Sequence, residues 1–199
     1  MGLINLFILP LSNTDMIVGL TGPNCAGKGE TAKYLQKKGF RYFSLSDEIR
    51  SELDKRGLEH TREHMIAAGN ELRSKEGHGV FALRVLRRLP KDHDIVIDSI
   101  RNPIEIETLR QHPLFVLWGI NAPVEIRFER AMKRGRTENA STLEEFKAIE
   151  EKENSGEAHK QQLKRCYKMA DKRIQNDGTF VQLYMQIDKL LKQDHFSAL

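Results

Sequence analysis

Short apolar runs alternate with amphipathic stretches along the chain from residue 16 onward. This alternation is typical of βα units arranged around a parallel sheet. Each apolar run is short enough to be a strand, and each is followed by a stretch with helical periodicity. The predicted strands are Met16–Thr21, Phe40–Leu45, Asp94–Asp98, Leu114–Asn121 and Lys172–Gln175.

The stretches between the strands carry signals for helix starts. Asn102 is a good capping residue, with Pro103 at the first helical position and Glu105 at the third. A capping box is expected at residues 141–144, starting from Ser141, and a similar one at 179–182. Helices are predicted over Glu30–Lys38, Asp47–Arg56, Thr61–Lys75 and Val80–Leu89.

Two intervals between strands are longer than one crossover helix requires. The first lies between the second and third strands, and the other runs from Pro123 to Asp171. Both insertions are expected near strand ends, where ligands bind in α/β sheets, and could close over a substrate. We therefore expect one α/β domain over residues 16–195, with insertions at about 46–90 and about 127–156.

Residues 1–15 precede the first convincing strand and are expected to be an extension of unknown role. The apolar run Leu3–Leu9 is too short to span a bilayer, and it lacks the ends of a secretory signal. Cys25 and Cys166 have no metal-ligand spacing, so we expect reduced thiols in a cytoplasmic protein. The hydrophobic share of 39% and charged share of 30% fit a globular domain and exclude disordered and membrane classes.

The first predicted strand leads into a glycine-rich turn with the spacing of a phosphate-binding loop. Gly22, Gly27 and Lys28 give the pattern G-x-x-x-x-G-K between a strand and a helix. The glycines let the backbone bend around a phosphate, and the helix N-terminus and Lys28 supply positive charge. The expected donor-binding residues are Gly22, Asn24, Cys25, Ala26, Gly27, Lys28, Gly29, Glu30 and Thr31.

Gly29 stands where such loops usually carry a Ser or Thr that ligates Mg²⁺. Here the sequence resembles the nucleoside monophosphate kinases, whose loops read G-K-G-T and whose metal is held largely through water. The resemblance implies ATP and Mg²⁺ as cofactors. It also implies a P-loop NTPase fold of three αβα layers with a five-stranded parallel sheet, a helical acceptor-binding insertion and an arginine lid. Thr31 could offer its hydroxyl only if the helix start shifts by one residue.

Two segments resemble the acceptor-binding motifs of adenylate kinases. Asp47 and Arg50 match the T-G-D-x-x-R segment, whose arginine grips the acceptor phosphate. Arg101 and Glu105 match the arginine and the base-reading glutamine of D-G-F-P-R-T-x-x-Q, although Asp98 is one residue closer to the arginine. An ionised Glu105 would favour a base that presents an amino group.

Arg73 and Asn70 share one helical face and could line the acceptor pocket, although a solvated helix face explains them equally well. Asp98 is the candidate for the outer shell of the metal, with a loop cap as its alternative. Asp177 is a candidate donor-binding residue because it lies in a turn that resembles the C-terminal N-x-G turn of these kinases, which passes near the donor base.

Arg127, Arg130 and Arg134 share one face of a predicted helix, at i, i+3 and i+7. The segment resembles the lid of nucleoside monophosphate and dephospho-coenzyme A kinases, where arginines clamp the migrating phosphoryl group. Arg130 and Arg134 match the adenylate kinase pair, and Arg136 extends the set. The alternative is a solvated basic helix paired with its own glutamates, which could account for Arg127.

Together these residues predict an ATP-dependent kinase that acts on a small nucleotide acceptor. Arg50 and Arg101 favour a ribo- or deoxynucleoside monophosphate. Asp47 also lies where dephospho-coenzyme A kinases place a general base, so transfer to a ribose hydroxyl stays open.

Neither a membrane nor nucleic acid is an expected partner, and the net charge of +4 is too mild to indicate nucleic acid. The chain could be a monomer or a homodimer. The alternative from another class is a nucleotide-binding regulator or nucleic-acid-associated ATPase, with a basic surface of Arg84, Arg87, Arg88 and the lid arginines.

Overall fold

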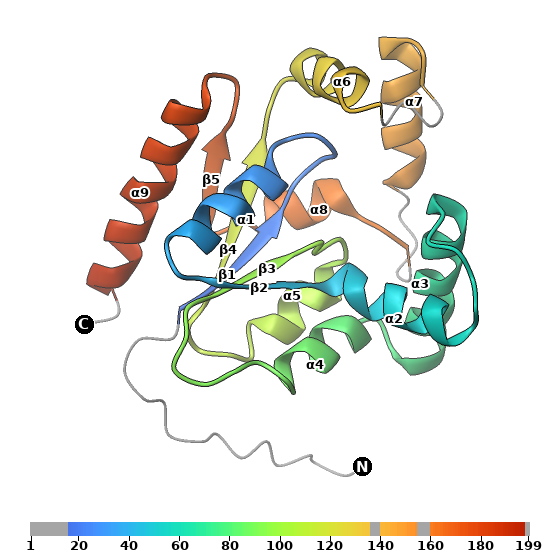
Figure 1. The fold of residues 1–199 in the computed structure, drawn as a ribbon, viewed down its shortest axis with the longest axis horizontal. Helices are drawn as coiled ribbons and strands as arrows, with labels where there is room; N and C mark the ends of the chain where they lie inside the picture. Colours follow the sequence, from blue (N-terminus) through green and yellow to red (C-terminus); the bar gives the residue numbers. More distant parts are fainter. Residues whose placement is uncertain (1–15, 136–139, 155–159, 198–199) are drawn as a thin grey trace.

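The computed structural model describes residues 16–135, 140–154 and 160–197. In this part of the chain, five strands form one parallel sheet in the order β2-β3-β1-β4-β5 (Figure 1). All five predicted strands are confirmed to within one residue at either end. The strands are β1 (Ile17–Thr21), β2 (Arg41–Ser44), β3 (Ile95–Asp98), β4 (Phe115–Asn121) and β5 (Lys172–Gln175).

The helices also follow the predicted pattern, with small differences at their ends. The capping box of Asn102 and Glu105 is confirmed, and Thr179 and Gln182 exchange the two expected hydrogen bonds. The box expected at Ser141 is formed one residue later, by Thr142 and Glu145. The helices are α1 (Lys28–Lys37), α2 (Leu45–Lys55), α3 (Arg62–Glu76), α4 (Val80–Leu86), α5 (Pro103–Leu109), α6 (Val124–Lys133), α7 (Leu143–Glu153), α8 (Leu163–Lys168) and α9 (Phe180–Ser197).

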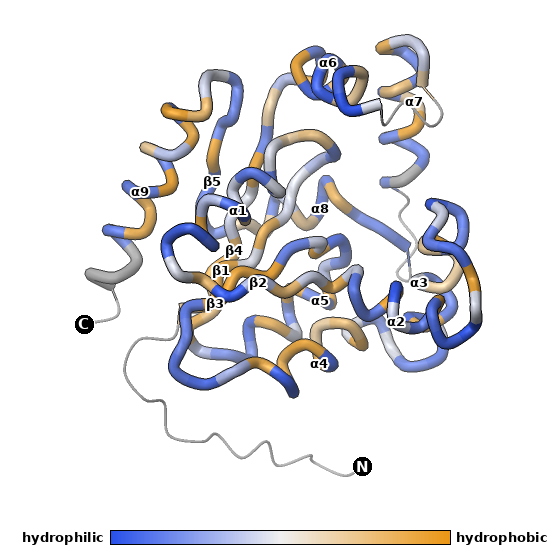
Figure 2. The backbone as a smooth tube through the Cα atoms, in the orientation of Figure 1, coloured by the Kyte–Doolittle hydropathy of each residue, from blue (hydrophilic) through white to orange (hydrophobic). Residues whose placement is uncertain are grey.

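The sheet is buried on both faces because helices cover each of them. On one face Val18 and Trp118 pack against α1 and α9. On the other, Ile17 and Ile97 pack against helices α2 to α5 and α8. The central strands accordingly carry the hydrophobic colour in Figure 2. The predicted three-layer αβα fold with a five-stranded parallel sheet is confirmed.

Helices α2 and α3 on one side, and α6 and α7 on the other, lie toward the edge of the sheet at which β1 passes into the glycine-rich turn (Figure 1). Helices α2, α3 and α4 connect β2 to β3, and α6, α7 and α8 connect β4 to β5. Because parallel strands end at the same edge, both connections start beside the turn. None of the described helices combines the length and the apolar character needed to cross a membrane.

Candidate active site

The glycine-rich turn, which we call the P-loop (residues 22–29), has a backbone that only glycine allows at two positions. Gly22 and Gly27 have φ values of 135° and 113°. A Cβ atom would lie 2.0 Å from the Ile120 carbonyl oxygen at Gly22, and 2.1 Å from Asn176 Nδ2 at Gly27. Cys25 also has a positive φ, 58°. These left-handed residues curl the chain into a concave turn suited to an anion.

Two side chains hold the P-loop in this shape from outside. Asn176 Nδ2 donates to the Ala26 carbonyl oxygen at 2.8 Å. Arg130 donates to the Asn176 carbonyl oxygen at 2.9 Å and to that of Ala26 at 3.4 Å. Its burial there, with Arg134 nearby, lowers the pKa of the Arg130 guanidinium. The sequence pointed to Asp177, which is exposed, and missed its buried neighbour Asn176, whose only signal was the N-x-G turn itself.

Substitution of Gly27 by Ala should damage the P-loop, whereas Gly29→Ala should not. At Gly27 the new methyl group meets Asn176 in a left-handed backbone, so we expect a loss of about 2 kcal/mol or more of stability and loss of donor binding. Gly29 lies in α1 with no atom within 4 Å of a Cβ position, so Ala should stabilise the helix by roughly 0.5–1 kcal/mol. Urea unfolding followed by the fluorescence of Trp118, together with ATP titration, measures both effects. Equal unfolding midpoints for the two variants would contradict this account.

Lys28 lies folded over the P-loop. Its Nζ donates to the carbonyl oxygens of Gly22 and Pro23, at 2.8 and 2.9 Å. Burial lowers the pKa of Lys28 to about 8, and the Arg101 guanidinium lowers it too, while the Asp98 carboxylate opposes the shift. The Lys28 ammonium group is therefore bound by two carbonyl oxygens, which are weak acceptors. The Asp98 carboxylate and the Arg101 guanidinium, which lie at and just after the end of β3, also act on it.

The residues that follow Lys28 do not offer a hydroxyl group to a metal. Helix α1 begins at Lys28, and fully buried Thr31 donates its hydroxyl back to the Gly27 carbonyl oxygen at 3.2 Å. Glu30 accepts a hydrogen bond of 2.5 Å from the Tyr184 hydroxyl of α9. The helix thus begins two residues before the predicted Glu30, and both Glu30 and Thr31 contact protein groups. Asp98 keeps a carboxylate near Lys28, with Oδ1 accepting the Ser99 amide at 2.6 Å.

A cavity of ≈ 420 Å³ opens between the P-loop and helices α2, α3, α6 and α7. We call it the inner cavity. Apolar side chains such as Ile49 and Phe81 form part of its wall. Glu150 is the one acidic side chain among the described residues that line it. Five arginines line it, from four different parts of the chain: Arg50, Arg62, Arg73, Arg101 and Arg134. An anionic ligand with an apolar part suits such a wall.

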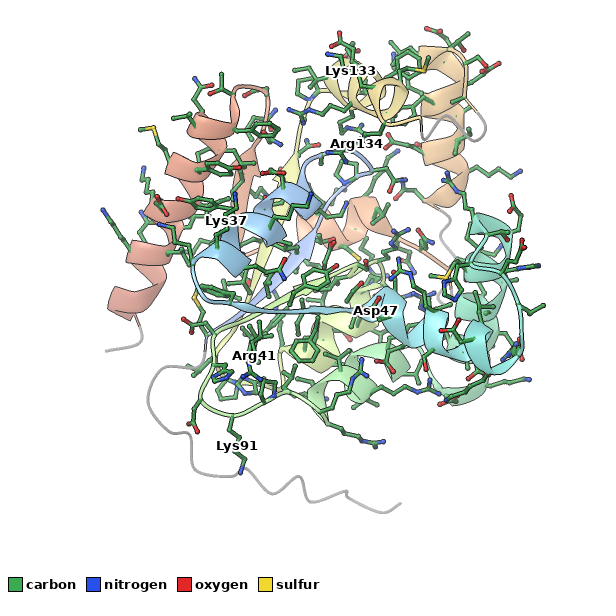
Figure 3. The ribbon with its side chains drawn as sticks, in the orientation of Figure 1. Lys37, Arg41, Asp47, Lys91, Lys133 and Arg134 are labelled. Atoms are coloured by element: carbon green, nitrogen blue, oxygen red, sulfur yellow. The ribbon has the colours of Figure 1, made fainter. Side chains whose placement is uncertain are left out.

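Arg50 and Arg101, which the sequence analysis proposed as acceptor-binding residues, both line the inner cavity. Arg101 Nη1 donates to Gln161 at 3.1 Å. Ser99, which lies between Asp98 and Arg101, adopts a φ of 67°, a left-handed conformation that is uncommon for a residue other than glycine. Asp47, at the start of α2 (Figure 3), is not among the lining residues, and its carboxylate accepts a hydrogen bond of 2.5 Å from Arg50.

Glu105 does not line the inner cavity. It is fully buried, and its Oε1 accepts from Arg73 Nε and Nη2 at 3.1 and 2.8 Å. Its Oε2 accepts the backbone amides of Arg101 and Asn102 at 2.9 and 3.0 Å. Both oxygens are therefore occupied by protein donors, and this geometry does not support the prediction that Glu105 reads a base. Arg73 does line the cavity, which favours the pocket interpretation over a solvated helix face.

The predicted lid arginines have three different environments. Arg127 is buried, bonds the Ala122 and Asn24 carbonyl oxygens at 3.0 and 3.3 Å, and pairs with Glu150 of α7. It is therefore not the solvated residue of the alternative interpretation. Arg130 contacts the P-loop, and Arg134 lies near it, lining the inner cavity (Figure 3). Arg136 falls outside the described residues.

Comparison with known proteins shows what the chain as a whole is similar to. The family model described as an AAA domain matches residues 18–172. A UPF0200 protein of Pyrococcus abyssi is 33% identical over 186 residues, which cover 89% of this chain and 96% of that protein. A UPF0200/UPF0201 protein of Archaeoglobus fulgidus is 33% identical over 181 residues, but the match spans only 54% of its length. The solved shikimate kinase of Aquifex aeolicus has a similar fold, with a TM-score of 0.51 and 17% identity over 90% or more of both chains.

Proposed function

Because the chain belongs to the UPF0200 family and has a P-loop kinase-like fold, we propose that it is an ATP-dependent kinase for a small nucleotide acceptor. One observation carries the proposal. The P-loop residues Asn24 and Cys25 line a cavity whose described lining holds five arginines and one acidic residue. Two of these arginines, Arg50 and Arg73, also pair with acidic residues that lie outside the lining. A protein that only bound a nucleotide would have no need of a second anion-binding cavity opposite its P-loop.

On the donor side, the P-loop amides and Lys28 would hold the outer phosphates of ATP. Lys28 Nζ would exchange its two carbonyl partners for phosphate oxygens, which are stronger acceptors. Arg130 would keep the loop in shape through Ala26 and Asn176, while Arg134 would reach the transferring group from the inner cavity. Asp177 remains a proposed neighbour of the donor base.

Mg²⁺ would fit this site through water and the donor phosphates. The described residues contain no group of three or more His, Cys, Asp or Glu side chains that could hold a metal ion. Asp98 is the carboxylate near Lys28, and Thr31 is turned inward. When bound, the ion would neutralise charge on the outer phosphates. The role of Asp98 would be to orient water in the outer shell of the ion.

On the acceptor side, Arg50, Arg73 and Arg101 would surround the anionic group. A nucleoside monophosphate would attack through a phosphate oxygen that is already ionised, so it needs no general base. A ribose hydroxyl would need one, and Asp47 is the proposed candidate. The ion pair between Asp47 and Arg50 makes Asp47 better placed to orient Arg50 than to take a proton.

ATP turnover across all ribo- and deoxynucleoside monophosphates and dephospho-coenzyme A tests the proposal. We expect a monophosphate to be the preferred acceptor. Asp47→Asn should slow transfer to a phosphate acceptor less than about tenfold, but slow transfer to a hydroxyl acceptor by a factor of about 100 or more. Asp54→Asn is the control, because Asp54 is an exposed acid of the same helix that contacts His60. No turnover with any acceptor, while ATP still binds, would disprove the kinase proposal.

The described surface gives little support to the alternative of a nucleic-acid-associated ATPase. Arg84 pairs with Glu76 and Arg88 with Glu48, so two arginines of the supposed basic surface are neutralised. Three other exposed basic residues do not join the lid arginines, because they lie away from Arg134 and the P-loop end: Lys37, Arg41 and Lys91 (Figure 3). Salt-dependent RNA binding without acceptor-dependent turnover would favour this alternative instead.

A further inference from the structure

A second hollow adjoins the inner cavity on the side of α3 and α7. This outer cleft has a volume of ≈ 470 Å³. It is lined by residues of α3, of α7 and of the segment that precedes α8. Four of these residues also line the inner cavity, namely Arg62, Ile66, Ile149 and Gln161. The two hollows therefore adjoin across these shared wall residues, and together they make up a space in which each part has the size of a small-molecule site, about 300–1,000 Å³.

The chemistry of this space changes along its length. At the P-loop end the wall carries Arg101 and Arg134. At the junction two partly buried aliphatic side chains, Ile66 of α3 and Ile149 of α7, line both hollows. Such a pair offers an apolar surface to a flat or aliphatic group, at about 25 cal/mol for each Å² of apolar area buried.

The lining of the outer cleft is basic as a whole. Its charged lining residues are Arg62, Lys152 and Lys160 against Glu63, a surplus of two positive charges. On α3, Asn70 and Arg73 are three residues apart and share a face, but Asn70 lines only the outer cleft and Arg73 only the inner cavity. One helix face thus serves both parts of the space.

We infer that the acceptor has two parts, with its reacting group at the arginines of the inner cavity and a second part, at least as large as a nucleobase, seated at Ile66 and Ile149. Negative charge at the edge of this second part would suit the outer cleft. The inference rests on the proposed kinase function and narrows its substrate class. A sugar phosphate alone would leave the isoleucine pair and the outer cleft empty, and would forfeit the burial they offer.

Calorimetric binding without ATP tests the inference, because it needs no phosphoryl transfer. The probes are ribose 5-phosphate, cytidine 5′-monophosphate and dephospho-coenzyme A. We expect at least one of the two larger probes to bind about tenfold or more tightly than ribose 5-phosphate, equivalent to about 1.4 kcal/mol. Equal affinities for all three would overturn the inference.

Two substitutions in the outer cleft sharpen the test. Asn70→Phe would fill the cleft, and Lys152→Glu would reverse a charge of its wall. Both should weaken the larger probe by about tenfold and leave ribose 5-phosphate within about twofold. Lys147→Glu is the matched control, because Lys147 is an exposed lysine of the same helix that does not line either hollow.

The outcomes separate the two proposals. If the larger probe binds and depends on Asn70 but no acceptor is phosphorylated, the kinase proposal fails and the two-part site stands. If a monophosphate is phosphorylated while Asn70→Phe affects all three probes alike, or affects none, the two-part site fails. Thermal unfolding of each variant shows whether Asn70→Phe is folded, and Lys152→Glu, an exposed change, serves if it is not.

Discussion

Lys28→Ala should reduce kcat/KM for phosphoryl transfer by a factor of about 1,000 or more, which corresponds to about 4 kcal/mol. The lysine is the one side chain with a full positive charge inside the P-loop, where its Nζ spans the Gly22 and Pro23 carbonyl oxygens. Without it, charge that develops on the outer phosphates loses its nearest partner. Steady-state kinetics with the preferred acceptor measures the loss. Lys37→Ala is the control, since Lys37 is an exposed lysine at the other end of α1 (Figure 3).

The same substitution should leave the fold intact. Burial lowers the pKa of Lys28 to about 8 in the folded protein, from 10.5, so keeping this lysine protonated at neutral pH costs stability. Lys28→Ala should therefore unfold at the same urea concentration as the parent protein, or at a higher one. A large fall in stability would attribute the loss of activity to misfolding instead.

The lowered pKa also sets the pH dependence of donor binding, because the anionic donor binds the protonated lysine. Affinity for ATP should be full below about pH 8 and fall as pH rises through that value, by up to about tenfold per pH unit. An affinity that stays constant from pH 7 to 9.5 would contradict the assignment of Lys28 as the donor-binding cation.

Glu105→Ala should have the largest effect on stability, a loss of about 3–5 kcal/mol. The substitution leaves the Arg73 guanidinium, whose side chain is 5% exposed, without its partner. It also removes the carboxylate that accepts the Arg101 and Asn102 amides. This carboxylate is part of the capping box at the start of helix α5. Urea unfolding followed by Trp118, the single tryptophan of the chain, measures the change.

The control for Glu105 is an ion pair of the same type at the surface. Glu76→Ala breaks the ion pair with Arg84, in which the Arg84 side chain is 28% exposed and the Glu76 side chain 43%. This substitution should lower the free energy of unfolding by less than about 1 kcal/mol. If Glu105→Ala cost no more than Glu76→Ala, the buried pair would have no structural role. In that case Glu105 would return as a candidate for contact with the acceptor.

Local spacing in the sequence determined the strands, most helix starts and the phosphate-binding loop. The alternation of apolar and amphipathic stretches predicted all five strands, because strand and helix periods are properties of neighbouring residues. The pattern from Gly22 to Lys28 predicted the P-loop for the same reason, since its shape follows from the backbone freedom of two glycines. Where two neighbouring residues could both cap a helix, as Ser141 and Thr142 can, the prediction from the sequence named the wrong one.

Tertiary structure decided the partners of the charged residues. Glu105 has the same spacing from Arg101 whether it reads a base or closes a capping box, and only the packing of α3 beside it, which brings Arg73, separates the two. The sequence likewise did not show whether Arg127 is solvated or buried, and its ion pair with Glu150 of α7 shows that it is buried. The role of Asn176 depends on its hydrogen bond to Ala26, which is far away in the sequence. Local patterns in the sequence therefore identified the P-loop and several arginines that line the inner cavity, but not Asn176 or Arg62. The division of the site into the P-loop, the inner cavity and the outer cleft depends on contacts between residues far apart in the chain, which local patterns do not encode.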